Sequence, residues 1–172
     1  MPQARASKVQ AEIGQRRPFR SSGQEGTVAL LRTASVVRRV IARALEPSGL
    51  SPAQYNALRI IRGAGKDGIP TLAIRERMIE EGTTITRLLD KLESAGLIRR
   101  ERGAPDRRQV LCYATAAGRR LLDELDPIVD AADAEAMASL SERQLDQLIR
   151  LLDTIRAANA ERAAPRTMVR GG

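Results

Sequence analysis

Residues 83–122 read TTITRLLDKLESAGLIRRERGAPDRRQVLCYATAAGRRLL, and the first third of this segment has the spacing of an amphipathic helix. Its apolar side chains follow the pattern i, i+3, i+4, i+7, which places them on one helix face: Ile85, Leu88, Leu89 and Leu92. Gly96 stands where a glycine commonly ends a helix. The pattern therefore predicts a helix over residues 83–95 that packs on a core through its leucines.

A second face of this helix is polar and carries no acid. Its members are spaced i, i+3, i+7, i+10: Thr84, Arg87, Lys91 and Ser94. Arginine can read guanine through two hydrogen bonds, threonine can bond a base edge or touch a thymine methyl, and lysine can reach a phosphate. Asp90 and Glu93 fall on a flank with Thr86, where they would repel DNA least. A solvated surface helix more often interleaves acids among its cations, so the pattern favours a helix that enters the major groove.

Two strands are predicted next, over residues 97–102 and 108–113, with a turn-forming run between them. The tip of this hairpin is basic, because Arg102, Arg107 and Arg108 surround Asp106. Arginine gains from the negative potential of a narrow minor groove, and an Asp in the loop can brace an arginine and cap the turn. A generic basic hairpin would have the same composition, but its position directly after the helix favours contact with DNA.

Helices are also predicted on the N-terminal side. Ser51 and Pro52 suit the N-cap and first position of one helix, and residues 71–79 predict a short one before a turn. Residues 25–46 have a helical apolar period: Leu30, Ala34, Val37, Ile41 and Leu45. A helix, a turn, the helix over 83–95 and a hairpin make a winged helix-turn-helix, which we expect to span residues 51–114.

On the C-terminal side, Thr115 can cap a long helix in which Pro127 predicts a kink or a break. Ser141 and Gln144 fit a capping box at the start of a last helix. The apolar stripes predicted for these helices are Leu121, Leu125, Ile128 and Ala132, and then Leu145, Leu148, Leu152 and Ile155. The stripes at 30–45 and 145–155 have few partners in a small winged-helix core. We therefore expect these stripes to be buried against a second chain, and packing within the same chain is the alternative.

The composition excludes several classes of protein. The chain of 172 residues has a net charge of +8, with +4 over residues 1–22 and −2 over residues 109–172, so its N-terminal end suits a polyanion. With no His and with Cys112 as the single cysteine, the commonest general base and most metal sites are missing. No catalytic arrangement of residues emerges, so we expect neither an enzyme nor a cofactor. No apolar run spans a membrane and no secretory signal is visible, so we expect a cytoplasmic protein.

Residues 83–122 resemble the MarR family of bacterial winged-helix regulators. The resemblance rests on the threonine-rich helix start, the LLDKLESAGLIRR run, the Asp-x-Arg signature at Asp106–Arg108 and the Thr-x-x-Gly step at Thr115. It extends more weakly from about residue 26 to residue 160 and implies a domain over 24–160 whose helices, at 24–46 and 116–160, intertwine in a dimer. By the family pattern, Asp106 braces the wing and Arg108 enters the minor groove. Ala114 departs from the pattern, since the family commonly has Leu there.

The two ends of the chain fall outside this domain. Residues 1–23 lack a sustained apolar period and are predicted to form a flexible basic arm, longer than is usual in the family. Such an arm is either a disordered tail or a segment that touches DNA or a partner subunit. Residues 161–172 are predicted to form a flexible tail.

The resemblance also suggests an effector. Many relatives are released from DNA by small phenolic or aromatic acids, and a pocket along the first two helices would offer cations to a carboxylate. The candidate ligand-binding residues are Arg38, Arg39, Arg43 and Tyr55. Relatives that sense oxidants use a cysteine, but Cys112 on a wing strand is better interpreted as a buried structural residue.

The sequence thus predicts a mostly α protein with a small β-hairpin wing that binds double-stranded DNA. We expect a homodimeric, sequence-specific transcriptional regulator, more simply a repressor, that binds a pseudo-palindromic promoter site. The residues expected to contact DNA are Thr83, Thr84, Thr86, Arg87, Lys91, Arg102, Arg107 and Arg108. The main alternative is a non-specific architectural DNA-binding protein. A further alternative is a protein adaptor that uses the same helices and does not bind DNA. In such an adaptor the helix face with Thr84, Arg87 and Lys91 would tolerate acidic residues.

Overall fold

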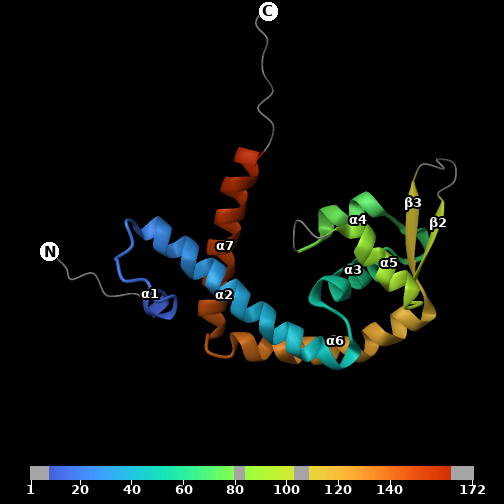
Figure 1. The fold of residues 1–172 in the computed structure, drawn as a ribbon, viewed down its shortest axis with the longest axis horizontal. Helices are drawn as coiled ribbons and strands as arrows, with labels where there is room; N and C mark the ends of the chain where they lie inside the picture. Colours follow the sequence, from blue (N-terminus) through green and yellow to red (C-terminus); the bar gives the residue numbers. More distant parts are fainter. Residues whose placement is uncertain (1–7, 80–83, 103–108, 164–172) are drawn as a thin grey trace, which may run out of the picture. The chain divides into compact units, whose positions relative to one another are not determined.

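The structure is a computed structural model that describes residues 8–79, 84–102 and 109–163 (Figure 1). The described chain is mostly helical with a small antiparallel sheet, as predicted. Its helices are α1 (Lys8–Glu12), α2 (Ser22–Leu45), η1 (Glu46–Ser48), α3 (Pro52–Gly63), η2 (Gly65–Asp67), α4 (Thr71–Arg77), α5 (Ile85–Ser94), α6 (Ala116–Met137) and α7 (Glu142–Ala163). Its strands are β1 (Ile69–Pro70), β2 (Ile98–Arg102) and β3 (Val110–Ala114). The chain divides into two compact units, residues 1–133 and 134–172.

Side-chain caps begin the helices at the predicted positions. The Oγ of Ser51 accepts a hydrogen bond from the backbone N–H of Gln54, whose side chain accepts from the N–H of Ser51. The Oγ1 of Thr115 accepts from the N–H of Gly118, 3.0 Å away. Ser141 and Gln144 form the same reciprocal pair as Ser51 and Gln54. Each pair satisfies donors that the first helical turn leaves unpaired, so these starts follow from local chemistry.

The sheet has three strands in the order β1-β3-β2. The predicted hairpin is present, with Ile98 opposite Ala114 and Arg102 opposite Val110. The third strand, β1, pairs with β3 through Ile69 and Cys112 and was not predicted. A two-residue strand is too short to show an alternating pattern, and its proline is tolerated because β1 is an edge strand.

The core of the first unit lies where α3, α5, α6 and the sheet meet. The largest fully buried side chains are Leu45, Leu58, Ile61, Ile74, Leu89, Leu92, Ile98, Leu122 and Cys112. The predicted stripe of α6 was wrong in part, because Leu122 and Val129 are buried whereas Ile128 is 47% exposed. α6 also continues through Pro127, so the break that this proline predicts is not found.

The junction between α5 and α6 depends on two glycines, Gly96 and Gly118. Gly96 has a φ of 68° and ends α5, and the N–H of Leu97 returns to the carbonyl of Leu92 at 3.0 Å. The carbonyl of Leu97 then accepts from the N–H of Thr115 at 3.0 Å. Gly118 packs so closely on this carbonyl that a Cβ atom would lie 2.1 Å from its oxygen. The end of α5 is therefore fastened to the start of α6.

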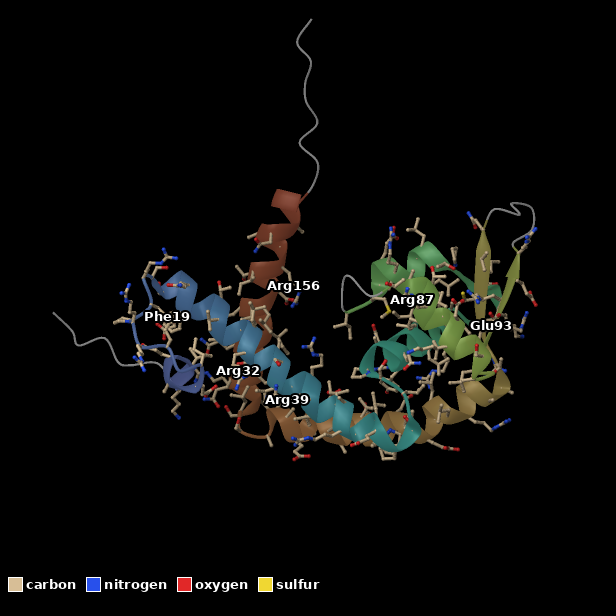
Figure 2. All side chains as sticks on the ribbon, viewed as in Figure 1. Phe19, Arg32, Arg39, Arg87, Glu93 and Arg156 are labelled. Carbon is tan, nitrogen blue, oxygen red and sulfur yellow. The ribbon has the colours of Figure 1, made fainter. Side chains whose placement is uncertain are left out.

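The N-terminal segment contains a helix that the sequence pattern did not predict. α1 lies within the residues interpreted as a flexible arm, packs against α2 and pairs its Glu12 with Arg32 at 3.9 Å. Figure 2 labels Arg32 on α2 and Phe19 in the connection between the two helices. α2 itself begins earlier than expected, because Ser21 caps it through the N–H of Gln24. Part of the expected arm is thus folded.

In the second unit, α7 carries several apolar side chains on its surface. Ile149, Leu151 and Ile155 are each about half exposed, whereas Leu145, Leu148 and Leu152 of the predicted stripe are partly buried. Across the part of the chain that the structure describes, no helix combines the length and the apolar character that a membrane span requires.

Candidate nucleic-acid interface

The helix α5 presents the predicted polar face to solvent. Leu88, Leu89 and Leu92 are buried and hold the helix on the core, as the apolar spacing predicts. Every member of the predicted polar face is exposed: Thr84, Arg87, Lys91 and Ser94. Thr86, on the flank with Asp90 and Glu93, is exposed as well. Figure 2 shows Arg87 on this helix. The predicted face therefore offers two cations and two hydroxyl groups to a partner. Thr83 lies outside the described residues.

The helix α4, which precedes the turn, is held in place by α3. Ile74 of α4 is fully buried, and the N–H of Ile79, just after α4, donates to the side chain of Asn56 on α3 at 3.0 Å. This hydrogen bond fixes the point at which the chain leaves α4 toward α5. α4 and α5 thus form a helix-turn-helix pair supported by α3.

The acids on the flank of α5 are paired with an arginine that sequence reasoning missed. Arg100 on β2 donates to Glu93 through Nε at 2.8 Å and to Asp90 through Nη2 at 2.6 Å. Hydrogen bonds with Arg100 lower the pKa of Glu93, and hydrogen bonds with Glu93 and Asp90 raise the pKa of Arg100. A signal was present, because two acids one helical turn apart precede an arginine on the adjoining strand.

The described part of the wing has cations on both faces. Arg102 is exposed at the end of β2. Arg99 lies on the opposite face of the strand from Arg100 and forms an ion pair with Glu101. The Arg99 guanidinium also lies 4.2 Å from the centre of the Tyr113 ring. Asp106, Arg107 and Arg108 lie outside the described residues, so their roles stay predictions.

The predicted effector residues are only partly brought together. An open hollow of about 630 Å³ lies between the end of α2 and the start of α3, and Arg39 and Arg43 line it. Its other lining residues are Ala42, Glu46, Gly49, Leu50, Ser51, Pro52 and Gln54. Arg38 and Tyr55 are not among them. Figure 2 labels Arg39 on α2, where it donates to the hydroxyl of Ser35 at 3.1 Å.

Tyr55 instead joins α3 to α6. Its ring is buried, its hydroxyl donates to Asp126 at 2.7 Å, and Arg62 donates to the other oxygen of the same carboxylate at 2.6 Å. Burial and the Asp126 carboxylate raise the pKa of Tyr55 to about 12. Burial raises the pKa of Asp126, but the hydrogen bonds from Tyr55 and Arg62 outweigh it, so that pKa is lowered. The hydroxyl of Tyr55 is therefore engaged within the protein.

Cys112 is a buried core residue, as interpreted from the sequence. Its Sγ lies 4.0 Å from the hydroxyl of Thr71, and burial raises the pKa of its thiol. A raised pKa and a closed environment are the opposite of what a reactive cysteine requires.

A helix-turn-helix with an outward cationic helix, followed by a two-stranded wing, defines a winged helix-turn-helix protein. A family model described as "MarR family" matches residues 50–110. The chain is 33% identical over 103 residues to the transcriptional regulator HosA of Escherichia coli O157:H7, covering 60% of this chain and 75% of HosA. The chain therefore belongs to the MarR family of winged helix-turn-helix transcriptional regulators. Members of this family bind DNA and are not enzymes. The expectation of a DNA-binding regulator and the expectation that the chain is not an enzyme are both confirmed.

Solved structures give the same result. The MarR transcription factor from Planctomyces limnophilus is 34% identical with a TM-score of 0.62, covering 80% of this chain and 99% of that one. CouR from Rhodococcus jostii RHA1, solved with bound p-coumaroyl-CoA, is 28% identical with a TM-score of 0.66, covering 80% and 95%. The predicted fold, including the helices on either side of the winged helix, is confirmed by this likeness.

Proposed function

We propose that this chain is a sequence-specific regulator that represses transcription by occupying a pseudo-palindromic promoter site as a homodimer. The observation that carries the proposal is the exposed face of α5, on which cations and hydroxyl groups stand together while the leucines opposite are buried. Occupying a promoter requires binding alone, so repression is the simplest consequence. Such a regulator works in the bacterial cytoplasm, at the nucleoid.

Each residue predicted to contact DNA has a role that its chemistry supports. Arg87 reads a guanine through two hydrogen bonds, and Thr84 and Thr86 bond base edges or contact a thymine methyl. Lys91 holds a phosphate, which contributes affinity without sequence preference. Thr83 extends this set at the start of the helix. The wing arginines Arg102, Arg107 and Arg108 enter the minor groove, with Asp106 bracing the loop.

A homodimer is favoured by apolar surface on the helices that flank the winged helix. On α2, Leu31 is 65% exposed and Leu30 and Val36 are about 40% exposed. Isolated apolar residues are common on surfaces, but contact with a second chain would remove these three side chains from water. We assign 24–46 and 116–160 to dimerisation and 51–114 to DNA binding. A two-fold dimer would place its α5 helices about 34–36 Å apart, in successive major grooves.

An aromatic or phenolic acid is the effector that the hollow at the end of α2 suits best. Arg39 and Arg43 supply cations for a carboxylate, and Leu50 and Pro52 supply apolar contacts. CouR was solved with bound p-coumaroyl-CoA, which shares the phenolic group of this class but has its acyl carboxyl in a thioester. Tyr55 could join the site only by giving up its hydrogen bond to Asp126.

Selection of bound sequences from a random DNA pool tests the proposal. The full chain is bound to the pool at one fixed salt concentration, and retained duplexes are sequenced after repeated rounds. Enrichment of an inverted repeat with half-sites one helical turn apart is the expected result. A pool that stays random after selection would instead support the non-specific architectural alternative, because phosphate contacts alone carry no sequence information.

A further inference from the structure

The side chain of Arg100 connects the wing to the helix α5 through several polar contacts. Its Nε and Nη2 both donate to Oε2 of Glu93, and Nη2 also donates to Asp90. The backbone N–H of Arg100 donates to Oε1 of Glu93 at 3.1 Å, so both oxygens of that carboxylate are held by one residue. The Arg100 side chain is 25% exposed, which makes it the most buried member of the cluster.

The cluster of Arg100, Asp90 and Glu93 lies beside the residues proposed to contact DNA. Asp90 and Glu93 lie on the same helix as Arg87 and Lys91, whose side chains face solvent. A duplex that approaches Arg87 and Lys91 brings its phosphates toward the flank of the helix. Unpaired carboxylates there would repel those phosphates, since like charges brought together at an interface are strongly unfavourable. Arg100 cancels part of this charge and draws both acids toward β2.

We propose that Arg100 is a positioning residue for DNA binding. It pairs with the acids of α5 and so removes their charge from the path of the duplex. The inference rests on the proposed insertion of α5 into a groove. The alternative is that Arg100 contacts a phosphate itself, but its Nε and Nη2 are already engaged with the two acids.

A set of variants of the full-length chain separates these roles. The probe is a duplex enriched by the wild-type chain from a random pool, with a random duplex of equal length beside it. Arg100→Ala leaves Asp90 and Glu93 uncompensated, and Arg100→Gln does so while keeping a hydrogen-bond donor. The variant Asp90→Asn/Glu93→Gln/Arg100→Ala removes the whole cluster. Arg99→Ala is the matched control, because it removes the same charge from the other face of the same strand.

The proposal predicts that Arg100→Ala and Arg100→Gln each raise the Kd for the enriched duplex about tenfold. The triple variant returns to within about threefold of wild type, because no acid then needs compensation. Arg99→Ala stays within the same range. Thermal melting shows which variants are folded, and if Arg100→Ala is not, Arg100→Gln and the triple variant carry the comparison.

Two results would overturn the proposal. Unchanged affinity in Arg100→Ala or Arg100→Gln would show that the acids need no compensation. A triple variant as weak as Arg100→Ala would assign Arg100 to direct phosphate contact. Arg87→Ala, measured alongside, keeps this inference distinct from the proposed function. A weakening with Arg87→Ala but none with Arg100→Ala rejects the role of Arg100 alone, whereas no weakening with Arg87→Ala rejects groove insertion of α5.

Discussion

Gly118 is the residue at which the helix α6 passes closest to the end of α5. The carbonyl of Leu97 already accepts a hydrogen bond from the N–H of Thr115, and the hydroxyl of Thr115 donates to the neighbouring carbonyl of Gly96 at 2.7 Å, so this segment cannot move away freely. A Cβ atom at position 118 would lie 2.1 Å from the carbonyl oxygen of Leu97, well inside contact distance. The family's Thr-x-x-Gly step thus has a steric reason in this chain.

We predict that Gly118→Ala lowers the free energy of unfolding by roughly 1–3 kcal/mol, because the backbone of Leu97 must shift. Gly26→Ala is the matched control, since Gly26 is also helical and has nothing within 4 Å of its Cβ position. That substitution is expected to stabilise the protein by up to about 1 kcal/mol. Urea unfolding of both variants measures the difference. Equal effects in the two variants would contradict the steric account.

Residues whose role is local could be predicted from the sequence, and residues whose role depends on a distant partner could not. Ser51 and Thr115 act on backbone groups within three residues, so their spacing alone identified them as caps. Tyr55 acts through a helix far along the chain, and Arg100 acts through the way the next strand packs against α5. The prediction that Tyr55 faces an effector missed Asp126, 71 positions away, because no local pattern marks such a pair.

At the scale of elements, α3 is fastened to α6 by the pair Tyr55 and Asp126, and this connection has a pH dependence. An unfolded tyrosine titrates near 10, whereas the folded pKa of Tyr55 is about 12. The neutral hydroxyl therefore contributes stability that is fully present below about pH 10 and is lost as the pH rises toward 12.

Tyr55→Phe is expected to cost about 1 kcal/mol at neutral pH, the net value of one hydrogen bond. The difference in the free energy of unfolding between wild type and variant should narrow between about pH 10 and 12, because only the wild type has this hydroxyl to ionise. Chemical unfolding of both proteins across that range provides the measurement. A constant difference would show that Tyr55 does not titrate as its surroundings require.

The wing is the element whose tip remains a prediction. If Arg108 occupies a minor groove, Arg108→Ala should weaken binding to specific and random duplexes alike. The slope of log K against log salt should also become shallower by about 0.9 for each phosphate that the variant no longer neutralises. Titrations at several salt concentrations give the slope. An unchanged affinity and slope would remove Arg108 from the interface.

Elements with a strong period were predicted well, and short or unusual ones were not. The leucines of α5 face the core as their spacing indicates, and the hairpin pairs in the expected order. β1 and α1 have two and five residues, which is too few to show a period. In α6 the alanines and two adjacent leucines, Leu121 and Leu122, allow more than one stripe, so packing rather than spacing decides which faces inward.

At the scale of the whole molecule, the proposed function requires self-association through apolar helix surface. Leu31→Arg should shift the chain from dimer toward monomer at micromolar concentration, because a charge would enter the proposed interface at a residue that is 65% exposed in the single chain. Leu72→Arg is the control and should leave the dimer intact, because Leu72 is 55% exposed on α4, outside the segments assigned to dimerisation. Sedimentation equilibrium gives the masses. A wild-type chain that is monomeric throughout would reject the homodimer.

The central claim is that the exposed face of α5 reads base sequence, and Arg87→Ala tests it most directly. Affinities for the selected duplex and for a random duplex are measured at one salt concentration, with Lys91→Ala beside it. The account predicts that Arg87→Ala loses roughly 1–3 kcal/mol on the selected duplex and much less on random DNA, whereas Lys91→Ala weakens both alike. Equal losses on both duplexes with Arg87→Ala would contradict base reading by this helix.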